Sequence, residues 1–212
     1  YYYLIFVIIS LGAHGQAVTP KSSFPTKPVV TNEAELRRAI LDTGKTQLKL
    51  REKPGANNKH PQITIYNRAV GVPDNAFYCA SGGYWCHLKA GVRLPIPAPA
   101  AVRSWFADTK KHVKWKQGEK VQVFDAVSMF KSHVEFVADT RGFDDDDEDF
   151  VQTIGWNTTG PGKTAQGCHV NFRHKDWIKA VANHITPFLQ SINKQKTIRY
   201  RIVFIKNKFN LN

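Results

Sequence analysis

The sequence predicts an α+β fold, with helices in the first half of the chain and an antiparallel sheet in the second half. Apolar residues up to about residue 106 recur at helical spacing, whereas from Val121 onward they alternate with a period of two. The chain has 212 residues, of which 42% are hydrophobic and 12% aromatic, so it is able to bury a core. One folded domain with short appendages is therefore expected.

The first 30 residues are expected to lie outside the folded domain. Residues 1–15 begin with an almost wholly apolar run and end in small residues, which is typical of a truncated secretory signal peptide. The run is too short to span a bilayer as a helix; a buried N-terminal strand is the alternative interpretation. Residues 16–30 contain three prolines and form a predicted linker. The mature protein is therefore expected to be secreted or periplasmic, with no stable membrane insertion.

Four helices are predicted in the first half of the domain. The first begins after Asn32, a residue type that caps helices, and carries acidic residues in its first turn. The others are predicted at residues 63–70, from Cys79 to Gly91, and at 101–106.

The second half is expected to supply the sheet. Strands are predicted at residues 121–129, 133–139, 151–158 and 168–173, with a further basic, strand-like segment at 196–209. A helix is predicted at 177–185, and the acidic run 144–149 reads as a solvated loop, with a calcium site as the alternative. These elements define a folded domain over residues 31–190 and a basic C-terminal tail over residues 191–212.

The charge of the chain indicates an anionic partner. The formal net charge is +13, which suits nucleic acid, an anionic membrane surface or an acidic cell-wall polymer. The sequence contains neither the basic helix nor the aromatic platform motif of nucleic-acid modules. Charge alone does not choose between a membrane surface and a wall polymer, and we expect no nucleic acid as a partner and a monomeric protein.

The segment around Cys79 predicts a nucleophile. Cys79 falls in the first turn of a predicted helix, where unpaired N–H groups and the helix dipole favour a thiolate over a thiol. A thiolate is the attacking form in cysteine enzymes. A buried structural cysteine is the alternative interpretation of the same residue.

His133 and Asn157 are the predicted partners of that nucleophile. His133 opens a strand directly after a tight turn, which places its ring at a sheet end, where it can face the start of a packed helix. Asn157 lies on the next strand, and its carboxamide oxygen could accept from the imidazole N–H. The order cysteine, histidine, asparagine on helix, strand and strand is a papain-like layout.

Four segments of the chain also resemble a known family. The segments occur in the same order as in that family. They are Tyr78-Cys79-Ala80 with Lys89-Ala90-Gly91-Val92, Phe124-Asp125-Ala126-Val127, His133-Val134-Glu135 and Gly155-Trp156-Asn157-Thr158. They resemble "Trp-Cys-Ala" with "Gln-Ala-Gly-Ile/Val", "Gly-Asp-Ile-Val", "His-Val-Gly" and "Glu-Gly-Asn-Thr" of the CHAP-type amidohydrolases. These are cysteine, histidine-dependent peptidoglycan hydrolases of the papain-like group, and the similarity covers residues 32–185.

This resemblance implies an exported cysteine amidase or endopeptidase that cuts amide bonds of peptidoglycan. It implies Cys79 as nucleophile, His133 as general base and acid, and Asn157 as the orienting group. No metal or cofactor is needed for this chemistry. The upstream match adds Tyr66 and Asn58 as candidates for the substrate groove, to which Tyr78 and Trp156 are joined as neighbours of the catalytic residues.

The sequence departs from the family pattern at several positions. Tyr78 replaces the usual Trp, Phe124 replaces a strand glycine, and Gly155 stands where many relatives carry a glutamate that orients the histidine. Gly82 and Gly83 are expected to weaken the Cys79 helix by about 1 kcal/mol each relative to alanine. A catalytically degenerate relative that binds wall polymer or a protein partner is therefore the alternative.

The two other cysteines, Cys86 and Cys168, have two open interpretations. They form a disulfide bridge that leaves Cys79 free, or they are two buried free thiols.

Overall fold

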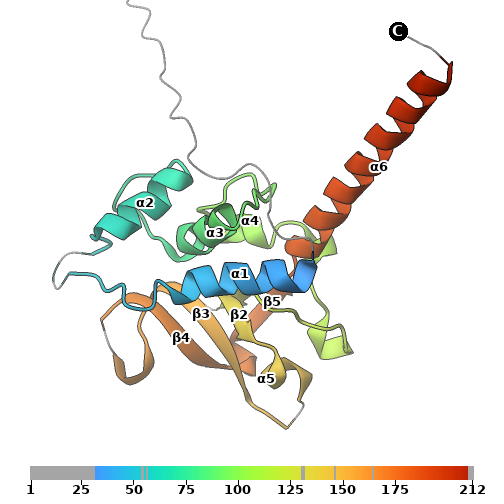
Figure 1. Cartoon of the computed structure of the whole chain (residues 1–212). Helices are drawn as coiled ribbons and strands as arrows, with labels where there is room; N and C mark the ends of the chain where they lie inside the picture. Colours follow the sequence, from blue (N-terminus) through green and yellow to red (C-terminus); the bar gives the residue numbers. More distant parts are fainter. Residues whose placement is uncertain are drawn as a thin grey trace, which may run out of the picture.

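The structure is a computed structural model that describes residues 32–209 apart from 54, 56, 130, 131, 146 and 164. The predicted signal peptide (1–15) and linker (16–30) lie outside these residues. The described chain has the expected α+β architecture, with helices first and a five-stranded antiparallel sheet after them. Helices α1–α4 lie together on one side of the sheet (Figure 1).

The helices of the first half form where their local signals predict them. Their bounds are α1 Glu33–Lys45, α2 Pro61–Ala69, α3 Cys79–Lys89 and α4 Val102–Trp105. The side chain of Asn32 accepts a hydrogen bond from the N–H of Ala34 (2.8 Å), which is the predicted cap of α1. Gly91, the predicted stop of the Cys79 helix, has a φ of 77°, a left-handed conformation that glycine adopts without strain.

The sheet has the strand order β4-β3-β2-β1-β5, and every neighbouring pair is antiparallel. Its strands are β1 Ala126–Met129, β2 His133–Asp139, β3 Phe150–Thr158, β4 Gly167–His174 and β5 Ile178–Ala182. The four predicted strands are thus present, although the first begins at Ala126 rather than Val121. Phe124 has a φ of 65° and precedes the strand in a turn. Short elements lie between the strands: α5 Arg141–Asp144 and 3-10 turns at Pro161–Lys163 and Lys175–Trp177. Two further 3-10 turns, Thr109–Lys111 and Trp115–Gln117, lie between α4 and β1.

Two sequence-based predictions after β4 are wrong. Residues 177–185 were expected to be helical, but β5 occupies Ile178–Ala182, because pairing with β1 buries Ile178, Val181 and Ala182. A short apolar run fits a strand and a buried helix equally well. Residues 196–209 were expected to be strand-like but belong to α6 (Ile185–Phe209).

Helix α6 also crosses the expected boundary between domain and tail at residue 190. Its first turns pack on the domain through the buried Ile185 and the half-buried Phe188 and Leu189. Its remainder projects away from the sheet (Figure 1). A segment without a neighbouring strand cannot form the hydrogen bonds of a sheet, whereas a helix forms its backbone hydrogen bonds within the segment, and this accounts for the difference from the predicted strand. None of the described helices combines the length and the apolar character that a bilayer crossing requires.

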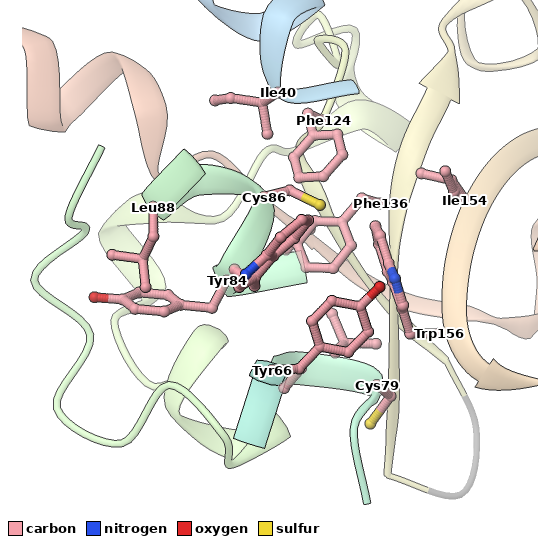
Figure 2. Packing of buried hydrophobic residues seen from close by; sticks show 14 of the residues in the cluster. Ile40, Tyr66, Cys79, Tyr84, Cys86, Leu88, Phe124, Phe136, Ile154 and Trp156 are labelled. Carbon is pink, nitrogen blue, oxygen red and sulfur yellow. The ribbon is translucent and has the colours of Figure 1, made fainter. Parts of the chain in front are cut away.

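The sheet has an apolar cluster on each face. The larger one fills the space between the helices and the sheet, and Figure 2 shows its aromatic side chains, including Phe136 and Trp156, next to α3. The smaller one covers the opposite face with valines such as Val127, Val137 and Val151. Successive side chains of a strand point to opposite faces of the sheet, so neighbouring residues contribute to different clusters.

Helix α3 lies very close to the sheet because of its two glycines. A Cβ atom on Gly82 would overlap the ring of Trp156, and one on Gly83 would overlap the ring of Phe136. The two glycines therefore do more than lower helix propensity, since they permit the contact that fixes α3, and with it Cys79, against β2 and β3.

We predict that Gly83→Ala destabilises the protein by about 1–3 kcal/mol, although alanine is the better helix former. The added methyl group has to displace the buried ring of Phe136. Urea unfolding followed by circular dichroism measures the change, with the exposed α6 residue Gln190→Ala as a control expected within about 0.5 kcal/mol of the wild type. A Gly83→Ala protein as stable as the wild type would contradict the close contact between α3 and β2.

Candidate active site

Cys79 is the first residue of α3, as predicted. The preceding Tyr78 makes no side-chain hydrogen bond that caps this helix, so the N–H groups of the first turn are not taken up by a cap. The Cys79 side chain is 6% exposed and lines a surface hollow together with Phe77 and His133. In Figure 2 its sulfur points away from Trp156, whereas the Cys86 sulfur lies among core side chains.

His133 opens β2 and faces Cys79 across this hollow. The Cys79 side chain is close enough to the ring to raise the pKa of His133. The other contact of the ring runs from Nε2 to Oε1 of Glu135 (3.2 Å), which leaves Nδ1 as the nitrogen available to the thiol. Because a carboxylate only accepts, Nε2 carries a proton and donates it to Glu135.

Glu135 is fully buried, and donors from three strands surround its carboxylate. Besides His133 it accepts hydrogen bonds from Thr153 on β3 and from Asn171 (3.3 Å) and Arg173 on β4. Arg173 binds it with both Nε (3.0 Å) and Nη2, in a bidentate ion pair. A buried carboxylate with this many donors is held in one orientation, and it fixes the His133 ring in turn.

The electrostatics of this pair favour a protonated imidazole. Burial lowers the pKa of His133, but the hydrogen bonds with Cys79 and Glu135 and the negative charge of Glu135 outweigh it and raise the pKa to about 9. Burial raises the pKa of Glu135, but the hydrogen bonds from His133 and Arg173 and their positive charges outweigh it and lower the pKa to about 2. At neutral pH the site therefore contains an imidazolium beside a carboxylate.

Gly155 stands directly opposite Glu135 in the pairing of β2 with β3. A Cβ atom on Gly155 would lie 2.7 Å from Cγ and Oε1 of Glu135. The missing side chain on β3 is therefore the space that the Glu135 carboxylate occupies. The sequence predicted that position 155 lacks an orienting carboxylate. Glu135 on the neighbouring strand supplies that carboxylate instead.

Asn157 lies next to His133 but not in the predicted relation to it. It sits in an irregularity of β3 between Trp156 and Thr158, has a φ of 54°, and lines the hollow on both sides of His133. Since Nε2 of His133 pairs with Glu135, the orienting contact that the sequence assigned to Asn157 is made by Glu135 instead.

The predicted groove residues are placed differently from expectation. Tyr66, Tyr78 and Trp156 have no exposed surface and belong to the core, which leaves them no surface for a substrate. The hydroxyl of Tyr66 donates to Gln47 (2.7 Å), and that of Tyr78 donates to Glu52 (2.9 Å). Asn58 lies in a separate hollow.

Cys86 and Cys168 are free, buried thiols, which is the second of the two interpretations left open by the sequence. Burial raises the pKa of both well above the ordinary value for a thiol, so neither is suited to nucleophilic attack. In the described part of the chain, no three His, Cys, Asp or Glu side chains are grouped so that they could hold a metal ion.

Sequence reasoning missed Glu135, Arg173 and Gln166. Glu135 had a signal, because residues two apart on a strand share a face, which puts its carboxylate on the side of His133. Arg173 had none, since only the pairing of β4 with β3 brings it to Glu135. Gln166 precedes β4 and lines the hollows beside Cys79 and His133.

This arrangement has the parts of a cysteine nucleophile site. It combines a thiol at a helix start, an imidazole in contact with it, and a buried group that orients the imidazole. The first-turn N–H groups of α3 are suitable donors for an oxyanion formed at Cys79. No protein-family model, curated protein or solved structure matches the chain.

We predict that Glu135→Gln lowers the pKa of His133 from about 9 by about one pH unit or more, because the neutral amide no longer favours the imidazolium. NMR titration of the His133 ring protons measures the change, with the signal assigned by its absence in His133→Gln.

A double variant, Glu135→Gln with Arg173→Met, avoids leaving the Arg173 cation unpaired and is expected to shift the pKa in the same direction. An unchanged His133 pKa in both proteins would show that Glu135 does not control the ring.

Proposed function

We propose that the protein is a cysteine hydrolase of amide bonds, with Cys79 as nucleophile, His133 as general base and acid, and Glu135 as the positioning residue. One observation carries the proposal: the His133 ring is held between the Cys79 thiol and a fully buried carboxylate. Buried charges are expensive unless they are paired, and they concentrate at functional sites.

The reaction follows from the positions of these groups. In the reacting form Cys79 and His133 share one proton, as a thiolate beside an imidazolium. The thiolate attacks the amide carbonyl carbon, and first-turn N–H groups of α3 bind the oxyanion. His133 gives its proton to the amine nitrogen as the C–N bond breaks, which leaves a thioester on Cys79. Water then attacks the thioester and passes a proton to His133, and the acid leaves as the C–S bond breaks.

The resemblance to CHAP-type hydrolases supports the same proposal in an altered form. The family pattern has glycine after "His-Val" and glutamate at the start of "Glu-Gly-Asn-Thr". Here these positions hold Glu135 and Gly155, which face each other across the strand pair. Exchange of the two residues keeps a carboxylate in the same space beside the histidine, so we propose that the departure at Gly155 leaves the catalytic site complete.

The proposed substrate is the peptide part of peptidoglycan, and the proposed location is outside the cytoplasm. The resemblance over residues 32–185 and the net charge of +13, which favours an anionic polymer, support this choice. Asn157 lines the hollow beside His133, and we propose that its carboxamide binds the substrate backbone there.

The alternative function is that of a degenerate relative that binds wall polymer or a protein partner without cutting it. Gly155, Gly82 and Gly83 motivated this alternative. Each of them now has a packing reason, because Gly155 accommodates Glu135 and the α3 glycines accommodate Trp156 and Phe136. The hydrolase is therefore the better supported function.

We predict that the purified protein releases new amino termini from purified peptidoglycan sacculi, and that Cys79→Ala lowers the rate about 1,000-fold or more, as expected for loss of a nucleophile. Labelling of the released amino groups measures the rate. Cys168→Ala is the matched control, since it removes another buried free thiol and is expected to keep the activity. Equal rates for Cys79→Ala and the wild type would reject the assigned nucleophile.

A further inference from the structure

Two hollows meet at the candidate site and form one groove. The first, about 560 Å³, contains Cys79; the second, about 650 Å³, extends to Arg173 and Trp177. Both are lined by His133, Asn157 and Gln166, so a bound chain can pass from one to the other. The first hollow is called the Cys79 half below.

The groove carries positive charge. Among the described residues, no aspartate or glutamate lines either half, whereas Arg103, Arg173 and the mostly protonated His133 do. Glu135 lies beneath the surface with no exposed area and is paired with Arg173. A groove whose charged side chains are cations attracts anionic ligands and repels cationic ones.

Arg103 and Arg173 differ in the partners that they already have. Arg173 is bound to Glu135 and also donates to Thr158 (3.0 Å). Arg103 is exposed, and no ion pair or side-chain hydrogen bond is recorded for it within the described part of the chain. Its guanidinium is therefore the group in the groove that is available to a ligand carboxylate.

The Cys79 half also has an apolar wall. Phe77, two residues before the nucleophile, is 76% exposed, and Ala100, Ala101 and Val102 line the same hollow. An exposed phenylalanine beside a nucleophile is covered when an apolar part of a ligand lies against it.

From this arrangement we infer that the Cys79 half binds a residue that combines a small apolar portion with a free carboxylate, and that Arg103 binds this carboxylate. The inference deepens the proposed function by naming the kind of residue recognised next to the amide bond that is cut. In that respect it rests on the proposed hydrolase, but the binding itself does not require that the amide is cleaved.

Alkylation with two small reagents tests the inference without hydrolysis. Iodoacetate and iodoacetamide both transfer a two-carbon group to the sulfur, with formation of a C–S bond and release of iodide, but only iodoacetate carries a carboxylate. The rate constants for Cys79 are measured by mass spectrometry of the Cys79 peptide, and the iodoacetate to iodoacetamide ratio is divided by the ratio for free cysteine. Cys86 and Cys168 are buried and serve as unreactive internal controls.

We predict that Arg103→Gln lowers this normalised ratio about 5- to 20-fold at low ionic strength, and that 1 M salt removes most of the difference from the wild type. Arg93→Gln is the matched control, because Arg93 is exposed and lies outside the groove lining, and it is expected to leave the ratio unchanged.

Two results would overturn the inference: a ratio in Arg103→Gln equal to that of the wild type, or an equal fall in Arg93→Gln, which would indicate net charge alone. The sacculus assay separates this inference from the proposed function. If the alkylation ratio depends on Arg103 but the protein releases no amino termini from sacculi, the carboxylate site is supported and the proposed hydrolase function is rejected.

Discussion

The buried carboxylate of Glu135 is the constraint on which the site depends. Removing a charge from water is expensive, and Glu135 is stabilised only because Arg173, His133, Thr153 and Asn171 all donate to it. These donors come from three adjacent strands, so a register slip of one residue would turn the carboxylate or its partners to the other face of the sheet. The strand register and the ionisation of His133 are therefore coupled.

The second requirement is the position of α3. In the proposed site, Cys79 can act with His133 only if the start of this helix stays near the start of β2. Gly82 and Gly83 set the distance between α3 and the sheet through contact with Trp156 and Phe136. The same burial removes a competing base. His87 on α3 bonds to the carbonyl of Gly83 (2.9 Å), and burial lowers its pKa to about 3, so it stays neutral and apart from the chemistry.

Local signals in the sequence predicted the parts of the fold that depend on neighbouring residues. The Asn32 cap, the start of α3 at Cys79 and the strand at His133 are all in place. Features that depend on distant pairing were not predictable: β5 needs β1, and the role of Glu135 needs the register that sets it opposite Gly155. Aromatic residues such as Tyr66 fit a groove as well as a core from sequence alone, and the core was the outcome.

The location of the orienting carboxylate has a consequence for the groove. A glutamate at the surface would cancel the charge of His133 for an incoming ligand, whereas Glu135 lies below the surface and its own charge is balanced by Arg173. The imidazolium and Arg103 therefore give the hollow at the start of α3 a positive field. The same field favours the negative charge that develops on a carbonyl oxygen under attack and the carboxylate of a neighbouring residue. In the proposed hydrolase, catalysis and selectivity for an anionic substrate thus depend on one arrangement of charges, in which the carboxylate of Glu135 is buried in the sheet.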